Sequence, residues 1–532
     1  MLRPAWGSRG SKGGVETAQS VPDGTPSQKN KKKQIGTKQR KGGGSMRLYD
    51  IVAEEERGDC PDGEIGSITD DTRALRKNDV FIAITGKNFD GHAACAEMIE
   101  KGAAAVVVER DLGLSRQIVV KNTRKFYTTL ASRYYGEPTK RLKLIAVTGT
   151  NGKTTTASMI RRLLNAAGRP SGYIGTAEYD VYGKIYPTRL TTPYQPELYR
   201  LFREMADNGA QYCVMEASSQ ALSQYRVYGE RFVCGVFTNL TQDHLDWHGT
   251  MENYYKAKRS LFYACESAVI FTDDPYGARL YKELSASGGG EGRDRPARLV
   301  SVSTTEPADL FSVNIKLRAG GSSYWLCSRE DEQSYPIELP SPGRFNVENS
   351  LCAAAACRAA GMTIRETAEA FRAVTGVRGR AEVLYDGAYT VICDYAHTAD
   401  ALEKILSAMK GFTKGKMIVV FGAAGERDAG KRKDMGATVA RYADLAVVTS
   451  DNPRFESPER IIEMVMEGFA DALCEAVPIT DRREAIEYAV ARAEAGDVLL
   501  LCGKGHEDYQ VIGDDYRPFS EREVIAELCG GS

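Results

Sequence analysis

Residues 143–164 read KLIAVTGTNGKTTTASMIRRLL, and this stretch decides how the middle of the chain folds. The apolar run 144–147 has the length of a buried strand, and a turn with two glycines, 148–152, follows it. After one lysine and three threonines, apolar residues recur at positions 157, 160, 163 and 164, which is helical spacing. The stretch therefore predicts a strand, a tight turn and a helix in direct succession.

This order of elements is typical of a phosphate-binding loop. Gly149 and Gly152 allow backbone N–H groups to close around phosphate oxygens, and the amino end of the helix adds positive potential. Lys153 can reach the terminal phosphates, and the Thr154 hydroxyl can ligate magnesium. Val147 stands where the first glycine of the GxxxxGK[ST] signature would fall, so the alternative is a helix-capping turn with a chance GKT. The flanking strand and helix favour nucleotide binding.

The composition is that of an ordinary protein with several domains. At 532 residues the chain has room for about three domains. The formal net charge of −1 gives no basic excess for nucleic acid. Twelve cysteines form no CxxC pair, so we expect neither a disulfide framework nor a zinc site, and a reducing cytoplasm fits best. No apolar run approaches the ~20 residues of a membrane helix, so we expect no stable membrane insertion.

Residues 1–45 differ from the rest, because they carry ten basic residues and only two acidic ones, Glu16 and Asp23. They contain no apolar core of a secretory signal. We expect a disordered basic tail, and an organellar transit peptide is the weaker alternative. Met46 begins the first segment whose sequence resembles a strand, and it is a candidate internal translation start.

Residues 46–140 are expected to form a small α/β unit. Strands are predicted at 80–84 and 104–108, and a helix at 93–101. Polar turns around Thr72 and at 86–91 are either part of a ligand site or ordinary surface loops.

The central segment, 141–377, alternates strands and helices, which predicts a mostly parallel sheet. A strand at 211–215 ends at Glu216, and a strand at 232–240 leads to His244. In an open parallel sheet the site lies at the carboxyl ends of the strands, so we expect these two residues near Lys153 and Thr154. An exposed glutamate and a capping histidine are the alternatives. A helix is expected over 253–262 and a low-complexity loop over 285–298.

The last segment, 378–532, repeats this pattern. Polar and charged residues follow each of four apolar strands, which are predicted at 390–393, 417–421, 445–449 and 498–502. Core packing does not require such residues there, so they predict an open α/β domain with a ligand-binding edge.

Ten motifs occur in a fixed order along the chain and carry a specific resemblance: TGTNGKTTT, EASSQAL, FTNLTQDHLDWHG, YYKAKRSLF, PGRFNVENS, GVRGRAE, DYAHT, GERDAGKR, SDNPR and GKGHEDYQ. From Met46 to the C-terminus the chain resembles the Mur ligases, and among them those that add the third residue of the peptidoglycan stem peptide. The resemblance implies three α/β domains: a small UDP-binding domain (46–140), a central P-loop-type ATPase domain (141–377) and a C-terminal Rossmann-like domain that binds the amino acid (378–532). It also implies a cytoplasmic enzyme, expected to be a monomer, that uses ATP and Mg²⁺.

The implied reaction joins UDP-MurNAc-L-Ala-D-Glu to an amino acid. ATP phosphorylates the D-Glu carboxylate, and an amine then displaces phosphate through a tetrahedral intermediate. Such a reaction needs positioning and charge neutralisation more than covalent catalysis. The implied catalytic residues are Lys153, Glu216, His244, Lys258 and Arg380.

The resemblance also assigns binding positions. Those for ATP are Gly149, Thr150, Asn151, Gly152, Lys153, Thr154, Thr155, Asn346, Arg380 and Asp394. Those for the UDP-linked dipeptide are Thr72, Lys87, Asn88, Phe89, Thr191, Thr192, Ser218, Gln224, Arg226 and Lys258. One magnesium would bind Thr154 and Glu216, and a second would bind Glu216, His244 and a carbamylated Lys258. Without the resemblance, Lys258 reads as a solvated helix lysine.

The amino acid predicted by the resemblance is meso-diaminopimelate. Its far carbon carries a carboxylate that L-lysine lacks, and the planar guanidinium of Arg454 can bind a carboxylate with two bonds. The alternatives are L-lysine or another diamino acid as the substrate, and an Arg454 that is an ordinary loop arginine in a salt bridge. The assigned positions are Arg427, Asp451, Asn452, Pro453, Arg454, Gly503 and Glu507.

Three places depart from the pattern of the Mur ligases. Gln220 replaces a histidine, Ala399 replaces a proline, and the pair 423–424 replaces Cys-Gly. None of them removes a predicted phosphate or metal ligand. Two rival readings are a ligase like the folylpolyglutamate synthetases and a non-catalytic scaffold with the same fold.

Overall fold

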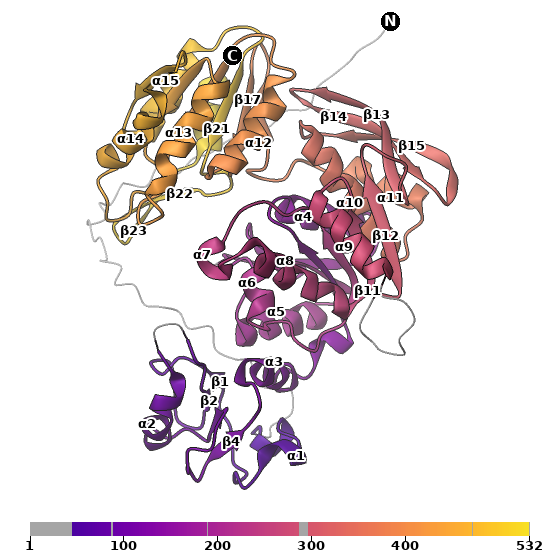
Figure 1. The fold of residues 1–532 in the computed structure, drawn as a ribbon, viewed down its shortest axis with the longest axis vertical. Coiled ribbons are helices and arrows are strands. Elements are labelled where there is room, and N and C mark those ends of the chain that lie inside the picture. Colours follow the sequence, from indigo (N-terminus) through magenta and orange to yellow (C-terminus); the bar gives the residue numbers. More distant parts are fainter. Residues whose placement is uncertain (1–44, 87–88, 189, 287–295, 471, 531–532) are drawn as a thin grey trace, which may run out of the picture. The chain divides into compact units, whose positions relative to one another are not determined.

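The structure is a computed structural model that describes residues 45–86, 89–188, 190–286, 296–470 and 472–530 (Figure 1). The predicted tail falls almost entirely on residues outside this part of the chain, as do Lys87, Asn88 and most of the predicted loop 285–298.

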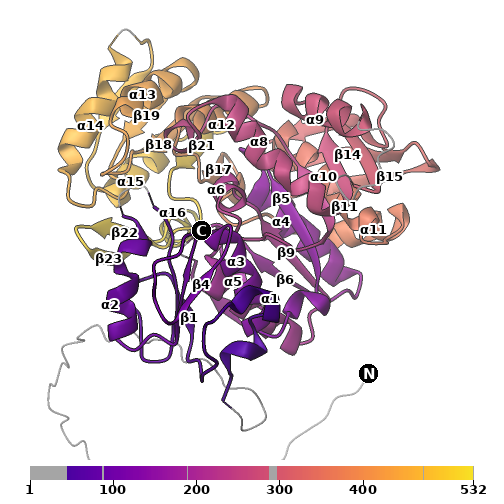
Figure 2. The ribbon, with the colours of Figure 1, turned by 60° about the horizontal axis from the view of Figure 1, so that its bottom comes forward.

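The first domain is a four-stranded parallel sheet with helices on both faces. Its strands, in the order β1-β2-β3-β4, are β1 Ile68–Thr69, β2 Val80–Ile82, β3 Ala105–Val108 and β4 Gln117–Val119. Its helices are α1 Glu54–Arg57, α2 Cys95–Glu100 and α3 Thr123–Tyr134. Helices α2 and α3 lie on opposite sides of this sheet (Figure 2). Alternate strand residues point to opposite faces, so Phe81 packs on the α2 side and Val80 on the α3 side.

The predicted elements of this domain are present with shifted ends. The strand expected at 80–84 ends at Ile82, and the strand expected at 104–108 begins at Ala105. The helix expected at 93–101 begins only at Cys95, because a 3-10 turn, Gly91–Ala94, precedes it.

The central domain is built on one sheet of eleven strands. In chain order they are β5 Lys143–Thr148, β6 Ser171–Ile174, β7 Tyr179–Asp180, β8 Ile185–Tyr186, β9 Tyr212–Glu216, β10 Phe232–Phe237, β11 Cys265–Phe271, β12 Arg298–Ser303, β13 Leu310–Arg318, β14 Gly321–Ser328 and β15 Asp331–Leu339. Their order across the sheet is β15-β14-β13-β12-β11-β10-β5-β9-β6-β7-β8. The strands from β13 to β6 pair in parallel, and antiparallel strands continue the sheet at both edges.

Helices cover both faces of this sheet. They are α4 Lys153–Ala166, α5 Gln195–Asp207, α6 Ser219–Ser223, α7 Leu245–His248, α8 Met251–Arg259, α9 Pro275–Ala286, α10 Arg344–Ala359 and α11 Ile364–Ala370. Ile145 and Val147 of β5 pack with α4 and α10, whereas Leu144 and Ala146 face the core that α5, α8 and α9 share. Because β5 is buried on both faces, its apolar run is continuous rather than alternating.

The C-terminal domain has a six-stranded sheet in the order β16-β17-β21-β18-β19-β20. Its strands are β16 Glu382–Asp386, β17 Thr390–Asp394, β18 Met417–Phe421, β19 Leu445–Val448, β20 Glu475–Pro478 and β21 Val498–Cys502, and a hairpin follows, β22 Tyr509–Ile512 and β23 Asp515–Pro518. All pairs except β16–β17 are parallel in this sheet. The helices are α12 Ala399–Lys410, α13 Gly430–Tyr442, α14 Pro458–Met466, α15 Arg482–Arg492 and α16 Glu521–Cys529.

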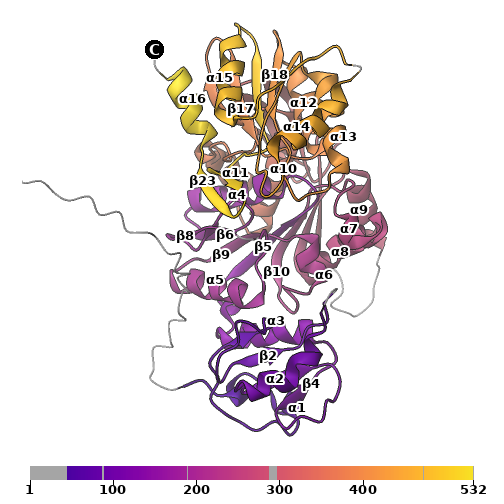
Figure 3. The same cartoon turned by 90° about the vertical axis from the view of Figure 1, so that its left-hand side faces the viewer.

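The helices of this domain also divide between the two faces. The first three, α12 to α14, pack against the residues of one face, and α15 and α16 pack against those of the other (Figure 3). The α/β class and the mostly parallel central sheet are confirmed. The three sheets fall within the three predicted ranges, and the domain limits themselves stay a prediction.

Candidate functional site

The predicted phosphate loop joins β5 directly to α4. Its glycines lie where no side chain fits: a Cβ on Gly149 would approach Thr238 Oγ1 to 1.9 Å, and a Cβ on Gly152 would approach Asn349 Oδ1 to 2.2 Å. Gly152 also has a φ of 81°, a conformation that favours glycine. The loop therefore needs both glycines for packing, independently of any ligand.

Two lysine amines point at this loop. Lys153 Nζ donates to the carbonyl oxygens of Gly149, at 3.0 Å, and Thr150, at 2.8 Å. Lys258 Nζ, on α8, donates to the same Gly149 oxygen at 2.6 Å. Burial lowers the pKa of Lys153, and burial together with the Lys153 charge holds the pKa of Lys258 well below its usual range. The reading of Lys258 as a solvated helix lysine is wrong, because only 1% of the residue is exposed.

Glu216 ends β9, the strand next to β5, and is fully buried. Its Oε1 accepts hydrogen bonds from the Tyr173 hydroxyl at 2.6 Å and the Thr176 backbone N–H at 2.8 Å. Its Oε2 accepts from the Thr176 hydroxyl at 3.1 Å. All three donors are neutral, and no described residue forms an ion pair with Glu216. A buried carboxylate of this kind suits a cation held at the strand ends.

His244 lies in a left-handed turn, with a φ of 50°, at the start of α7. Its Nε2 lies 3.4 Å from Asp243 Oδ2, and its ring meets the Tyr254 ring edge-on, with centroids 6.2 Å apart. The Lys258 amine lies 4.5 Å above the same Tyr254 ring, and the Tyr254 hydroxyl is 3.2 Å from Thr150 Oγ1. Tyr254 thus packs between three predicted site residues, and sequence reasoning did not single it out.

The predicted magnesium ligands do not form a complete protein cage. Within the described part of the chain, no group of three or more His, Cys, Asp or Glu side chains is arranged to hold a metal ion. Magnesium is commonly bound by one or two carboxylates together with substrate phosphates and water, so such a cage is not required. The buried Glu216 carboxylate and the Thr154 hydroxyl fit this kind of site. The two magnesium ligand sets stay predictions.

Arg380 reaches the phosphate loop from the C-terminal segment. Its Nη2 donates to the Thr154 hydroxyl at 3.3 Å, and its guanidinium lies 4.8 Å above the Tyr395 ring. Asp394, at the end of β17, accepts hydrogen bonds from the N–H groups of Ala381 and Ala396, and burial raises its pKa.

Asn346, at the start of α10, is buried as well. Its Nδ2 donates to Pro342 O at 2.7 Å, whereas its buried Oδ1 has no hydrogen-bond partner among the described residues. That oxygen is an unused acceptor at a position predicted to bind ATP.

A second contact from the C-terminal segment involves Asp400, at the start of α12. Its Oδ2 accepts hydrogen bonds from Asn151 Nδ2 at 3.2 Å and from the Thr241 hydroxyl at 3.2 Å. Lys404, one turn later, donates to the same oxygen at 2.9 Å. Sequence reasoning missed this contact, because a helical Asp–Lys pair four residues apart normally indicates only a solvated face.

The structure brings together the five positions predicted to hold the dipeptide in the central domain. The Thr192 hydroxyl donates to Glu216 O at 2.7 Å, and the Thr191 hydroxyl lies 3.0 Å from that of Thr176. Ser218 N donates to the Thr192 hydroxyl at 3.1 Å. The buried Arg226 bonds Thr192 O and also donates to Gln224 Oε1 at 2.6 and 3.0 Å.

The predicted UDP contacts lie at one edge of the first sheet. Thr72 follows β1, and Phe89, which is 57% exposed, follows β2. Because β1 and β2 pair in parallel, both residues lie beyond the carboxyl ends of their strands. Lys87 and Asn88 are outside the described residues.

The predicted amino-acid positions follow three strands of the C-terminal sheet. Asp451 to Arg454 follow β19, Gly503 and Glu507 follow β21, and the exposed Arg427 follows β18. The first two loops touch, because Asn452 Nδ2 donates to Glu507 Oε2 at 2.8 Å. The loop after β18 packs on them: a Cβ on Gly425 would approach Pro453 O to 1.9 Å.

Arg454 is an unpaired cation in this cluster. Among the described residues its guanidinium makes no ion pair and no hydrogen bond, and its Nε is buried without a partner. Its backbone is fixed by the hairpin, because its N–H donates to Val511 O at 3.0 Å and its carbonyl accepts from Gly513 N at 2.7 Å. The structure therefore does not support the alternative, an ordinary loop arginine in a salt bridge.

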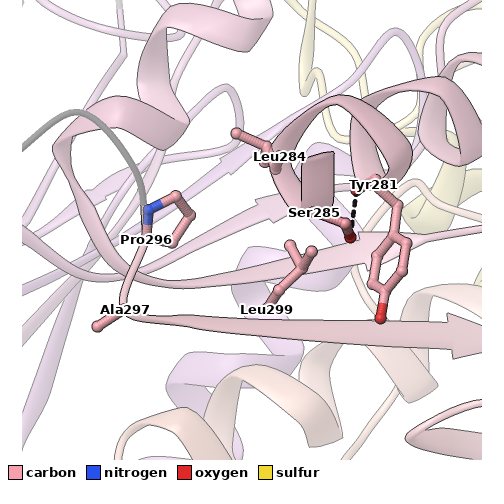
Figure 4. Close-up of a pocket in the computed structure, with 6 residues that line it drawn as sticks. All are labelled: Tyr281, Leu284, Ser285, Pro296, Ala297 and Leu299. Carbon is pink, nitrogen blue, oxygen red and sulfur yellow. Dashed lines mark hydrogen bonds between the residues drawn. The ribbon is translucent and has the colours of Figure 1, made fainter. Parts of the chain in front are cut away.

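A shallow pocket elsewhere does not belong to this site. It lies between the end of α9 and the start of β12 and is lined by Tyr281, Leu284, Ser285, Pro296, Ala297 and Leu299 (Figure 4). This is the amino end of β12, the edge opposite to the carboxyl ends that bear the site residues.

Three family models match the chain in sequence order. The model described as "Mur ligase family, catalytic domain" matches residues 64–135, the "Mur ligase middle domain" matches 147–357, and the "Mur ligase, glutamate ligase domain" matches 379–505.

Curated relatives are similar over most of the chain. The protein of Clostridium tetani (strain Massachusetts / E88) named UDP-N-acetylmuramoyl-L-alanyl-D-glutamate--2,6-diaminopimelate ligase is 41% identical over 475 residues, which is 87% of this chain and 95% of that protein. The protein of the same name from Geobacillus kaustophilus (strain HTA426) is 41% identical over 472 residues, 87% of this chain and 94% of its own.

Solved structures agree. One titled as the structure of the same kind of ligase is 30% identical, with a TM-score of 0.66, and covers 92% of this chain and 99% of its own. A folylpolyglutamate synthase of Mycobacterium tuberculosis, 18% identical with a TM-score of 0.56, covers 71% of this chain and 92% of its own and shares the fold alone. Since relatives about 40% identical span nearly the whole chain, the chain belongs to the Mur ligase family.

Proposed function

We propose that this chain is an ATP-dependent ligase that adds meso-2,6-diaminopimelate to UDP-MurNAc-L-Ala-D-Glu in peptidoglycan precursor synthesis. The names of its relatives support this function, and one structural observation carries it. Arg454 presents a cation with no protein partner among the described residues, two residues from Asn452, which is bonded to Glu507. A free guanidinium and a carboxylate in one cluster of loops match an amino acid whose far carbon bears both an ammonium and a carboxylate.

The first chemical step transfers the γ-phosphoryl group of ATP to the D-Glu carboxylate. An oxygen–phosphorus bond forms, the bond to ADP breaks, and the product is an acyl phosphate. Lys153, which lies against the loop carbonyls of Gly149 and Thr150, turns toward the phosphates and stabilises their charge. Arg380 adds a second cation beside Thr154. Preorganised charges of this kind supply most of the stabilisation that phosphoryl transfer requires.

Magnesium would be held by Thr154 and Glu216, and a second ion by Glu216, His244 and a carbamylated Lys258. Bound magnesium would neutralise charge on the phosphate oxygens. Lys258 suits carbamylation, because among the described residues its buried amine contacts the Gly149 carbonyl and the Tyr254 ring and forms no ion pair. Carbon dioxide would add to the neutral amine, an N–C bond would form and one proton would leave. The resulting carboxylate-like oxygens are ligands that magnesium prefers.

In the second step the amine of the amino acid attacks the acyl carbon. A carbon–nitrogen bond forms, the amine loses a proton, and the bond to phosphate breaks. The amino-acid cluster orients the nucleophile: Arg454 binds the far carboxylate, and Glu507 and Asn452 lie at the position for the far ammonium. Thr192, Ser218 and Arg226 hold the dipeptide end beside Glu216.

The substrates are cytoplasmic small molecules, and we place the reaction there. None of the helices in the described residues has the length and apolar character needed to cross a membrane. The chain is expected to act as a monomer.

The test is phosphate release by the purified protein. Release should require ATP, the UDP-linked dipeptide and an amino acid, and in a panel of amino acids meso-diaminopimelate should give the highest kcat/KM. Release that needs a folate substrate instead would favour the folylpolyglutamate reading. A protein that binds the nucleotide and releases no phosphate under any combination would favour the scaffold reading.

A further inference from the structure

Lys504 is a fully buried cation behind the amino-acid cluster. The strands β19 and β21 are not neighbours, because β18 lies between them, so the loops that follow them meet across the end of β18. Lys504 lies in the loop after β21, and none of its side-chain surface is exposed. It has therefore no surface to offer to a substrate, and its contacts are all with the protein.

The amine of Lys504 contacts three polar groups, and two of them, on Asn452 and Asp451, belong to the other loop. Its Nζ donates to Asn452 Oδ1 at 2.8 Å and lies 3.2 Å from Asp451 Oδ1 and 3.4 Å from Glu507 Oε2. The contacts with Asn452 and Glu507 are hydrogen bonds, whereas the contact with Asp451 is an ion pair without a hydrogen bond. All three residues are assigned to amino-acid binding by sequence reasoning, which did not single out Lys504 itself.

These contacts decide which way the Asn452 amide points. Its Oδ1 accepts from Lys504 and also from Val511 N at 2.9 Å, so two donors fix the position of the oxygen. The Nδ2 must then point the other way, where it donates to Glu507 Oε2. Removing the amine would free the amide to turn and would release the Glu507 carboxylate.

Lys504 also sets the charge of the cluster. Asp451 and Glu507 together carry two negative charges, and Lys504 neutralises one of them. The remaining negative charge matches one incoming ammonium, and the free guanidinium of Arg454 in the same cluster matches a carboxylate. Without Lys504, both carboxylates would lose the cation that lies within 3.4 Å of each of them.

We propose that Lys504 is a positioning residue for the incoming amino acid, because it fixes the Asn452 amide and holds Glu507 in place for the substrate ammonium. The proposal rests on the proposed function, since it takes the diamino acid to be the ligand of this cluster. It predicts that a change at Lys504 alters the KM for the amino acid and leaves the KM values for ATP and the UDP-linked dipeptide nearly unchanged.

The experiment compares Lys504→Gln, Lys504→Arg and the control Lys433→Gln, which changes an exposed lysine of α13 in the same domain. For each protein the KM values for meso-diaminopimelate, ATP and the UDP-linked dipeptide are measured, with kcat and the melting temperature. Lys504→Gln should raise the KM for meso-diaminopimelate about tenfold or more, because a charged donor that bonds Asn452 and Glu507 and pairs with Asp451 is lost. The other two KM values should stay within about twofold. Lys504→Arg, which keeps the charge, should recover part of the loss, and Lys433→Gln should match the wild type.

Three results would overturn the proposal: an unchanged KM for meso-diaminopimelate in Lys504→Gln, an equal rise of all three KM values with a lower melting temperature, or failure of both Lys504 variants to fold. The last two would show that Lys504 supports the domain as a whole. A wild type that does not use meso-diaminopimelate is a different outcome, because it refutes the proposed function before any variant is compared.

Discussion

Replacing Arg454 by alanine is the most direct test of substrate choice. The change should be local, because the backbone of residue 454 is fixed at both its N–H and its carbonyl by Val511 and Gly513. The side chain contributes no ion pair among the described residues, so no other protein charge loses a partner. The backbone of residue 454 has a left-handed φ of 54°, and this conformation costs free energy for alanine as it does for arginine.

The size of the effect follows from the missing contact. A charge-assisted hydrogen bond is worth about 1.5–3 kcal/mol. Because about 1.4 kcal/mol is a factor of ten, the ratio of kcat/KM for meso-diaminopimelate over L-lysine should fall by roughly 10- to 150-fold. The kcat/KM for L-lysine should change little, since L-lysine has no far carboxylate for the guanidinium to bind.

The assay is phosphate release with each amino acid in turn. The proteins are wild type, Arg454→Ala, Arg454→Lys and the control Arg517→Ala, which removes an exposed arginine from β23 of the adjacent hairpin. Arg454→Lys should fall between the others, because it keeps the charge and loses the bidentate geometry. A mutant that retains the wild-type ratio would show that selection lies elsewhere in the pocket. A wild type that prefers L-lysine would refute the assignment of the substrate.

Three further outcomes are expected. Lys153→Ala should lower kcat by about 10²- to 10³-fold or more, and near-normal phosphate release would contradict its role. Lys258→Ala should be almost inactive and partly restored by a small carboxylate; electron density showing a bare Lys258 ammonium pointing to solvent in a magnesium–nucleotide complex would exclude carbamylation. Burial raises the pKa of Glu348 from 4.5 to about 7, so the folded protein binds this proton more tightly than the unfolded chain, and stability falls as pH rises through this window. Replacing Glu348 by Gln removes this titration from the folded protein. The gain in the free energy of unfolding should therefore be up to ~3 kcal/mol larger at pH 8 than at pH 4. Equal shifts of the melting temperature at both pH values would contradict this.

The parts of the site that were predictable from sequence are those with a local pattern. The apolar run before Gly149 and the periodic residues after Lys153 define the strand and the helix, and the structure has both within a residue or two. Glu216 was correctly placed at a strand end. The strand predicted at 232–240 ends earlier, at Phe237, because the chain there turns to bond the phosphate loop through Thr238 and Asn239.

The unpredicted residues are those whose role depends on contacts between distant segments. Tyr173 and Thr176 hold Glu216, yet neither belongs to a motif that indicates this. In the sequence, Lys504 is one of the polar residues that follow the strand at 498–502, and only the structure shows that it reaches Asn452 in the loop after another strand. Side-chain contacts across a sheet have no fixed spacing in sequence, so periodicity cannot reveal them.

Tyr395 shows what such contacts add to the account of the reaction. It lies in the DYAHT motif beside Asp394, and no pattern in the sequence assigns it a role. Its ring lies 4.8 Å below the guanidinium of Arg380, which bonds Thr154 of the phosphate loop. Its hydroxyl donates to Glu507 Oε1 at 3.4 Å, in the amino-acid cluster. The proposed reaction requires the acyl phosphate to form before the amine attacks, so the ATP site and the amino-acid site must be set relative to each other. One aromatic side chain touches the cation of the first site and the carboxylate of the second, which gives this alignment a physical basis.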